Sequence, residues 1–259
     1  MGLVEIEDRG AVRHVVMTRS EKRNAMNGEM VLALGEAFRE AAAEDSVRVV
    51  VVRGDGPMFS SGMDLGSLAD LSEQPQSLRA FRTEVLTAWN RLEEMTKPTI
   101  CQIHGACIGG AMELALACDL RVMAKDAVIG MPETRIGLIP DVGGSSRLPQ
   151  IVGLGRAKEL VMTGKMINGD EAERIGLVNR VATIDKLGPE TQKLIDELLA
   201  CAPVAVGLAK RVMDASARPA LAATLELEVA MQEVCARSAD YAEGAKAFQE
   251  KRQPEFSGQ

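Results

Sequence analysis

A lone carboxylate, Glu113, follows two adjacent glycines in the stretch GACIGGAMELALACD, which covers residues 105–119 and is otherwise apolar up to its final aspartate. The order of residues predicts a strand, a turn at Gly109 and Gly110, and then a helix. The first N–H groups of a helix have no intrahelical acceptor, and the helix dipole adds partial positive charge at that end. Because glycine has no side chain, a ligand can approach the backbone closely. The stretch therefore predicts a place where an oxyanion would bind.

Glu113 lies three residues after Gly110, so one helical turn places its carboxyl group near the same end of the helix. A carboxylate in the first turn can simply cap the helix. The alternative is proton transfer, which at neutral pH requires a raised pKa. Burial beside apolar residues such as Ile108 and Met112 would raise the pKa of this carboxyl group. Both interpretations stay open for this segment alone.

A second segment points to the same chemistry. The run VRVVVVRG, residues 47–54, is typical of a strand covered on both faces, and it leads into the glycine-bearing loop DGPMFSSGMDL. If this loop reaches the same pocket, the amide of Met63 faces it together with the amide at the glycine turn. Two convergent N–H donors form an oxyanion hole.

Two further acids follow prolines in VIGMPETRIGLIPDVGG, residues 128–144. Glu133 follows Pro132, and Asp141 follows Pro140. Both have apolar neighbours, so burial would raise their pKa values as well. An acid after a proline is also an ordinary turn residue, and Asp141 is equally consistent with a helix N-cap.

Composition excludes several classes of protein. The chain has 259 residues, 46% hydrophobic and 26% charged, which suits one large domain with an appendage. A net charge of -7 disfavours a nucleic-acid surface. Five cysteines without a CxxC spacing disfavour a disulfide framework or a zinc ribbon, and two histidines disfavour a histidine-rich metal site. The opening residues lack a secretory pattern and no apolar run is long enough to span a membrane, so we expect a cytoplasmic protein.

Strand and helix patterns alternate along most of the chain. A hairpin is expected around residues 8–10, a helix over 28–45, a strand over 47–54, a helix over 77–95, a strand near 99–105 and another strand near 120–131. This alternation predicts an α/β fold. Strand patterns end at about residue 182, and the rest reads as helices. We therefore expect an α/β core over residues 1–186 and a helical region over 187–259 that packs against it.

Five segments together resemble one known family. They are FSSGMDL, GACIGGAMELALACDLRV, MPETRIGLIPDVGGSSRLPQIVG, MTGKMINGDEAERIGLVNRV and AFQEKRQPEF. Their order and spacing, from about Val4 to Phe256, are similar to those of the enoyl-CoA hydratase/isomerase family, also called the crotonase family. The resemblance implies a spiral of strand-strand-helix turns, with a C-terminal helical region that mediates trimers, commonly paired into hexamers.

The resemblance also implies roles for the residues singled out above. The two oxyanion-hole amides fall on Met63 and Gly110, where they would bind the carbonyl oxygen of an acyl-CoA thioester. Glu113 would help to activate water for attack at the β-carbon, while Glu133 would deliver a proton to the α-carbon. No metal or redox cofactor is implied, since coenzyme A is part of the substrate.

The coenzyme A part of the substrate would run along the backbone of three residues, Ala25, Asp64 and Leu65. Arg23, and Lys251 from the same or a neighbouring subunit, are the candidates for its phosphates. The acyl end would be lined by residues 65–85.

Asp141 departs from the hydratase pattern. Typical hydratases of the family have a small residue here, whereas dienoyl-CoA isomerases have an aspartate that moves a proton. Those isomerases usually carry aspartate at the position of Glu113 too, so this chain combines a hydratase pair with an isomerase-like acid. We expect an enoyl-CoA hydratase, with a double-bond isomerase that uses Glu133 and Asp141 as the alternative. A non-catalytic acyl-CoA-binding protein is a third, less favoured interpretation.

Overall fold

The computed structural model describes residues 2–66, 75–218 and 220–257, so part of the segment expected to line the acyl end lies outside the described residues. The strands are β1 (Val4–Arg9), β2 (Val12–Met17), β3 (Val49–Gly54), β4 (Thr99–Ile103), β5 (Ala106–Ile108), β6 (Leu120–Ala124), β7 (Val128–Gly130), β8 (Ile167–Asn168) and β9 (Arg180–Ala182). The helices are η1 (Ser20–Lys22), α1 (Gly28–Ala43), α3 (Pro75–Glu94), α4 (Gly110–Ala117), η2 (Glu133–Ile136), α5 (Gly144–Val152), α6 (Leu154–Thr163), α7 (Gly169–Arg174), α8 (Ile184–Leu199), α9 (Pro203–Ala217), α10 (Leu221–Ala236) and α11 (Ala239–Gln249).

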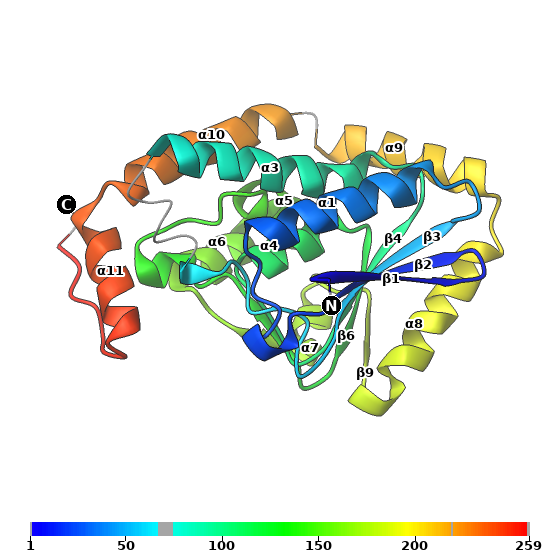
Figure 1. Ribbon diagram of the computed structural model, residues 1–259, viewed down its shortest axis with the longest axis horizontal. Coiled ribbons are helices and arrows are strands. Elements are labelled where there is room, and N and C mark those ends of the chain that lie inside the picture. The colour runs from blue at the N-terminus through cyan, green and yellow to red at the C-terminus, as the bar shows by residue number, and fades with distance from the viewer. Residues whose placement is uncertain (1, 67–74, 219, 258–259) are drawn as a thin grey trace.

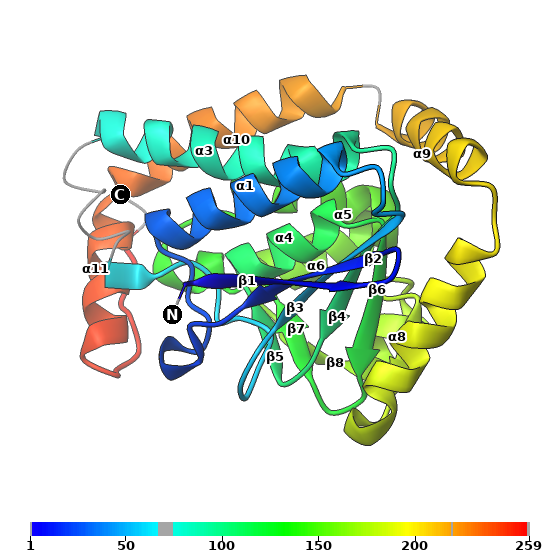
Figure 2. The same cartoon turned by 45° about the vertical axis from the view of Figure 1, so that its right-hand side comes forward.

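Within the described residues the strands form two sheets. The larger has the order β1-β2-β3-β4-β6-β9, in which only the β1–β2 hairpin is antiparallel. The four consecutive valines of β3 are buried, because helices cover both faces of this sheet. Helix α1 packs beside β1 and β2, α8 packs beside β3, β6 and β9, and the sheet runs between these helices (Figures 1 and 2). The expectation of an α/β fold with a hairpin at its start is confirmed.

The smaller sheet has the order β5-β7-β8, and it gives the chain a spiral course. After β4 the chain enters β5 in the smaller sheet and then helix α4. After β6 it enters β7 in the smaller sheet and then η2. The loop after β3 makes the same move, because Ser60 forms a parallel bridge with Cys107 of β5. Each turn of the spiral therefore visits the large sheet, the small sheet and a helix.

The expected single strand near residues 120–131 is two strands, β6 and β7. Lys125 and Asp126 form a turn between them, closed by a hydrogen bond of 3.0 Å from Ala127 N to Ala124 O. This turn moves the chain from one sheet to the other. Strands β5 and β8 were not expected, since runs of three and two residues are too short to show a pattern.

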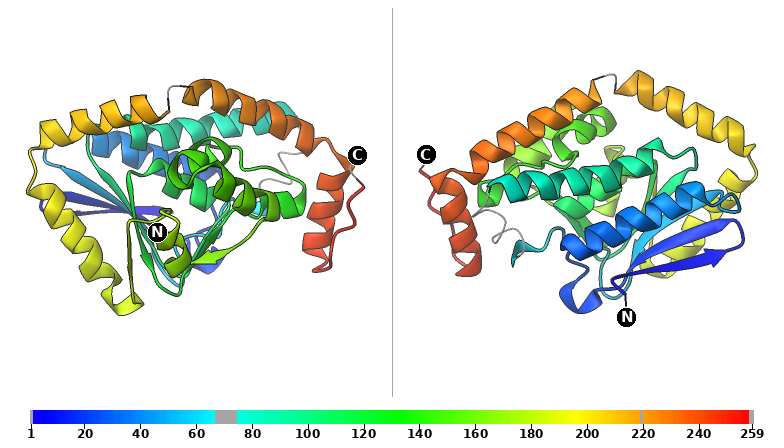
Figure 3. Two further views of the ribbon diagram at one scale, coloured as in Figure 1. Left: turned by 180° about the vertical axis from the view of Figure 1, so that it is seen from behind. Right: turned by 45° about the horizontal axis from the view of Figure 1, so that its top comes forward.

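The C-terminal residues form helices only, as expected. Helix α8 begins at Ile184 and packs on the large sheet, so it completes the cover of the core. Helices α9 and α10 lie along the outer edge of the molecule and lead to α11 at one end (Figure 3). Helix α10 contacts α3, α5 and α11, so the helical region packs against the core. None of the described helices combines the length and apolar character needed to cross a membrane.

A buried ion pair fastens α9 to the core. Lys210 Nζ lies 2.8 Å from a carboxylate oxygen of Asp119, and it also donates to the carbonyl oxygens of Leu92 (2.6 Å) and Lys97 (3.3 Å). The same Asp119 carboxylate accepts from Thr99 N and Thr99 Oγ1 at 2.7 and 2.9 Å. Removing the cation would leave a poorly solvated carboxylate and two carbonyl groups without a donor.

We expect Lys210→Met to lower the free energy of unfolding by about 3 kcal/mol, because breaking one half of a buried ion pair strands its partner. Chemical denaturation followed by circular dichroism measures this quantity. The matched control is Arg211→Met, which removes a cation from an exposed position one residue further along α9. Equal effects of the two substitutions would show that the pair does not hold α9 in place.

Candidate active site

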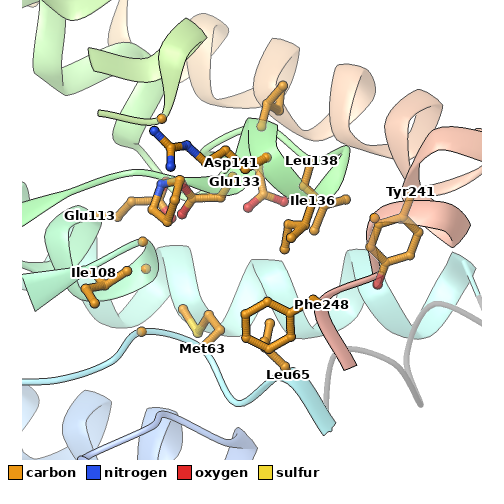
Figure 4. A pocket seen from close by; sticks show the side chains of 18 of the residues that line it. Met63, Leu65, Ile108, Glu113, Glu133, Ile136, Leu138, Asp141, Tyr241 and Phe248 are labelled. Atoms are coloured by element: carbon orange, nitrogen blue, oxygen red, sulfur yellow. The ribbon is translucent and has the colours of Figure 1, made fainter. Parts of the chain in front are cut away.

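A cavity of about 630 Å³ lies at the junction of the loop after β3, the N-terminus of α4, and helices α3, α10 and α11. Its lining is mainly apolar, with Tyr241 and Phe248 contributed by α11. All three acids expected from the sequence, Glu113, Glu133 and Asp141, line it. Figure 4 shows these acids gathered on one side of the cavity, across from Met63 and Leu65.

The amides of Met63 and Gly110 belong to residues that line this cavity. Neither N–H donates to any acceptor in the part of the chain that the structure describes. Several amides close to them are bonded: Gly109 N donates to Gly130 O, Asp64 N donates to Met26 O, and Met26 N donates to Gly62 O. Two backbone donors without an acceptor in the described protein therefore belong to residues that line an apolar cavity.

Close backbone approach brings these two segments together. Gly62 has φ +95°, and a Cβ atom there would lie 2.4 Å from the carbonyl oxygen of Ile108 and 3.5 Å from the nitrogen of Gly110. Gly109 has φ +58° at the start of α4, a conformation that favours glycine. Only glycine fits at both positions, which explains the glycines that the sequence places before each donor.

Glu113 is 2% exposed, and a single oxygen, Oε1, accepts hydrogen bonds from Val142 N (2.9 Å) and Gly144 N (2.8 Å). The other oxygen has no protein partner among the described residues. Burial raises the pKa of Glu113 well above its ordinary value, and nearby acids add to the shift. The hydrogen bond from Val142 N opposes the shift, because it stabilises the carboxylate. Glu113 thus does not cap α4, and its carboxylate instead ties α4 to the loop that carries Asp141.

Glu133 is the first residue of η2 and lies against the glycine turn. A Cβ atom on Gly109 would lie 2.7 Å from Glu133 Oε1, and Glu133 Oε2 is buried without a hydrogen-bond partner in the described structure. Burial raises the pKa of Glu133 to about 8, with a further contribution from the charge of Asp141. At neutral pH this side chain is mostly protonated and can donate a proton into the cavity.

Asp141 pairs with a buried arginine that sequence analysis did not single out. Arg82, on α3, forms an ion pair with Asp141 Oδ2 and donates to the Asp141 carbonyl oxygen. Burial raises the pKa of Asp141 to about 7, and Arg82 limits the rise. A buried glutamate, Glu228 of α10, adds to the rise through its negative charge.

The sequence does not mark Arg82 as functional, and it marks Glu228 only weakly. Arg82 lies in a helical stretch with several charged residues, which is typical of a solvated face. Glu228 lies among apolar residues in LELEVAM, and an acid within an apolar helical stretch is the weak signal that was available.

Of the residues expected to bind coenzyme A, some line the cavity and others do not. Arg23 and Leu65 line it. Ala25 and Asp64 lie beside it, joined by Arg19, which donates to Ala25 O at 2.8 Å and to Asp64 Oδ2 at 2.7 Å. Lys251 is exposed and does not line the cavity.

Arg252, one residue after Lys251, lines the cavity instead and pairs with Glu243. Among the described residues, no cluster of histidine, cysteine or acidic side chains has an arrangement that would hold a metal ion.

Comparison with known proteins places this arrangement in context. A family model described as enoyl-CoA hydratase/isomerase matches residues 7–259. An enoyl-CoA isomerase/hydratase of Mycosarcoma maydis is 35% identical, over 95% of this chain and 93% of its own length. A crotonyl-CoA hydratase of Syntrophomonas wolfei is 33% identical, over 98% of this chain and 96% of its own. The crystal structure of an enoyl-CoA hydratase from Mycobacterium avium subsp. paratuberculosis superposes with a TM-score of 0.89 at 27% identity, over 99% of both chains.

The raised pKa of Glu133 predicts the sign of a pH effect on stability. The folded protein retains this proton after the unfolded chain has released it, so stability from this group is present below a pH of about 4.5 and is lost as pH rises toward 8. Glutamine does not ionise. We therefore expect Glu133→Gln to exceed the wild type in free energy of unfolding by about 2 kcal/mol at pH 9, with the difference shrinking toward pH 4.

Urea denaturation at several pH values measures this difference. Glu84→Gln, at an exposed position on α3, is the control and should show no such trend. A difference between Glu133→Gln and wild type that is constant with pH, or that grows as pH falls, would contradict the prediction.

Proposed function

The chain belongs to the enoyl-CoA hydratase/isomerase family, and from this premise we propose that it is an enoyl-CoA hydratase, which adds water to the double bond of a trans-2-enoyl-CoA thioester. The observation that carries this proposal is the placement of Glu113 and Glu133 in one apolar cavity with the unbonded amides of Met63 and Gly110. The family has the same two activities in its description, hydration and isomerisation.

In this mechanism the thioester carbonyl oxygen accepts hydrogen bonds from Met63 N and Gly110 N. As the double bond polarises, negative charge builds on that oxygen, and each donor stabilises it by roughly 3 kcal/mol. Water adds to the β-carbon, and a proton adds to the α-carbon. Holding the water and the thioester in one cavity also removes the entropic cost of bringing them together.

The two glutamates would divide the proton transfers. Glu133, with a pKa of about 8, holds the proton that the α-carbon receives. Glu113 accepts the proton from water. Burial is the main cause of the raised pKa of Glu113, and the charges of Asp141, Glu133 and Glu228 add to it, so protonation of these neighbours removes only the added part of the rise. The hydrogen bond from Val142 also favours the carboxylate at Glu113, whereas Glu133 Oε2 has no such partner in the described structure.

Double-bond isomerisation is the second candidate, and Asp141 supports it. This carboxyl group lines the same cavity and has a pKa of about 7, so it can both accept and donate a proton at neutral pH. In that reaction one of Glu133 and Asp141 removes a proton from one carbon of the acyl chain, and a proton returns to another carbon. The same amides would stabilise the dienolate.

Coenzyme A would lie at the mouth of the cavity. We propose that its backbone contacts involve Ala25, Asp64 and Leu65, and that Arg23 contacts its phosphates. At the C-terminus Arg252 is a better candidate than Lys251 for contact with the phosphates, because Arg252 lines the cavity. No cofactor beyond the coenzyme A of the substrate is proposed, and a cytoplasmic location remains a prediction from the sequence.

We further propose that the protein forms a trimer, or a hexamer of two trimers, through its C-terminal helices. Helix α9 exposes Val204, Leu208 and Val212, spaced four residues apart, and α10 exposes an apolar series of its own, Leu227, Met231 and Val234. Such stripes of apolar side chains are typical of surfaces that a partner covers.

Turnover of enoyl-CoA substrates tests the proposed reaction. Crotonyl-CoA and longer trans-2-enoyl-CoAs should lose the absorbance of the conjugated thioester, and Glu113→Gln and Glu133→Gln should each lower kcat about 10²- to 10⁴-fold. Asp141→Asn should retain most hydration but abolish isomerisation.

Absence of hydration for every chain length, together with isomerisation that is lost in a folded Asp141→Asn variant, would favour the isomerase. If acyl-CoA raises the melting temperature while no enoyl or dienoyl substrate is converted, the protein is a non-catalytic acyl-CoA-binding member of the family.

Light scattering during gel filtration tests the assembly. A trimer has three times the chain mass of 27.7 kDa, and Leu208→Glu should release monomers by placing a charge in the interface. Leu154→Glu, at an exposed apolar position on α6, should leave the mass unchanged. A monomeric wild-type protein would refute this proposal.

A further inference from the structure

The loop that carries Asp141, residues 137–144, is held from several sides by hydrogen bonds to its backbone. Ile139 N donates to Gln232 Oε1 at 3.0 Å, and Gly143 N donates to Glu228 Oε2 at 2.8 Å. Both acceptors lie on one face of α10, four residues apart. The two hydrogen bonds to Glu113 hold the end of the same loop. Asp141 is therefore presented to the cavity by contacts that leave its backbone little freedom.

The ion pair places Arg82 and Asp141 at different depths. The Arg82 side chain is 3% exposed and that of Asp141 is 15% exposed, and both residues line the cavity. Arg82 forms an ion pair with the carboxylate of Asp141 through Nε, and its Nη2 donates to the carbonyl oxygen of Asp141. Neither Nε nor Nη1 has a partner with hydrogen-bond geometry in the described structure. The guanidinium thus acts mainly on Asp141.

Glu228 approaches the Asp141 loop from α10. It is 4% exposed, its Oε2 binds Gly143 N, and its Oε1 has no hydrogen-bond partner among the residues described. Burial raises the pKa of Glu228 itself. When it is ionised, this carboxylate repels negative charge on Asp141, whereas Arg82 attracts that charge.

We propose that Arg82 and Glu228 are positioning residues whose opposite charges act on Asp141 and together set the pH range in which this carboxyl group exchanges a proton with the acyl chain. Two helices far apart in sequence, α3 and α10, thereby tune one side chain. The proposal deepens the isomerase function proposed for this cavity and rests on it for its catalytic meaning.

The other titratable groups around Asp141 do not duplicate this pair. They are Glu133 of η2, Glu113 of α4, and the thiol of Cys235 on α10. All of them are neutral or negative. The other buried cation nearby, Arg147 of α5, is occupied by a two-pronged ion pair with Glu93. Arg82 is therefore the cation paired with Asp141 among the described side chains. Removing the charge of Arg82 and removing the charge of Glu228 should shift the pKa of Asp141 in opposite directions.

The experiment compares three variants at these positions with the full-length wild-type protein. Arg82→Gln removes the attraction, Glu228→Gln removes the repulsion, and Arg82→Lys restores a positive charge. The control is Arg79→Gln: Arg79 lies three residues before Arg82 on α3, is exposed, and pairs with Glu233 of α10. It tests whether loss of any α3–α10 ion pair has the same effect.

Titration of Asp141 is followed by carbon-13 NMR of protein labelled at the aspartate carboxyl carbon, with Asp141→Asn identifying the signal. We expect its midpoint to rise by about 1 pH unit or more in Arg82→Gln and to fall by about 1 pH unit in Glu228→Gln. Arg82→Lys should lie close to the wild type, and Arg79→Gln should not shift it.

Shifts of the same sign in both glutamine variants, or no shift in folded variants, would overturn the proposal. If Arg82→Gln does not fold, Glu228→Gln still tests the predicted direction of the shift in the titration of Asp141. Arg82→Lys then tests whether a positive charge at this position is sufficient to keep the titration at its wild-type midpoint. The titration requires no turnover. If the proposed function is wrong, isomerisation will be absent but the shifts in the titration of Asp141 will still be observed. Where isomerisation is present, the limb of its pH profile that reports Asp141 should move in the same two directions.

Discussion

Two backbone N–H groups without an acceptor in the described protein, on Met63 and Gly110, are the feature around which the site is arranged. Unpaired amides at a poorly solvated position cost stability, so a fold that keeps two of them side by side needs a rigid support. That support is the spiral: the loop after β3 bridges to β5 through Ser60 and Cys107, and this bridge brings the loop against the glycine turn. In the mechanism proposed for this site, a thioester oxygen between the two amides would accept a hydrogen bond from each of them.

The acids across the cavity follow a second constraint, namely that closely spaced buried carboxyl groups cannot all be ionised. Glu113, Glu133, Asp141 and Glu228 influence one another, and one arginine pairs with this group directly. Protons are therefore shared among them at neutral pH, which is the state needed for groups that both give and take protons. Glu113 also joins α4 to the loop that positions Asp141, because its carboxylate accepts two hydrogen bonds from the backbone of that loop.

Much of this could be predicted from the sequence. Local patterns predicted the hairpin, the buried strand β3, the glycine turn before α4 and the helical C-terminal region, since each depends on neighbouring residues. The three acids and the two amides were expected to share a site, and all five residues line the same cavity. The boundary between residues 186 and 187 stays a prediction, although α8 packs on the sheet as part of its cover.

Other features depend on contacts between distant segments and left no local signal. Arg82 meets Asp141 across 59 residues, and Glu228 meets Gly143 across 85. Strands β5 and β8 form because β7 pairs with both of them. With three and two residues, they are too short to show the alternation of polar and apolar residues that marks a strand in a sequence. At the C-terminus the chain's turn after α11 directs Arg252 into the cavity lining and leaves Lys251 exposed, an offset of one residue that sequence patterns do not resolve.

The central claim is that the amides of Met63 and Gly110 withdraw electrons from a thioester carbonyl. The most direct measurement is the Raman difference spectrum of a bound acyl-CoA labelled with carbon-13 at its carbonyl carbon. Binding should move the carbonyl stretch to lower frequency than in solution, because two hydrogen bonds weaken the C=O bond. A stretch at the solution frequency in a saturated complex would contradict the account.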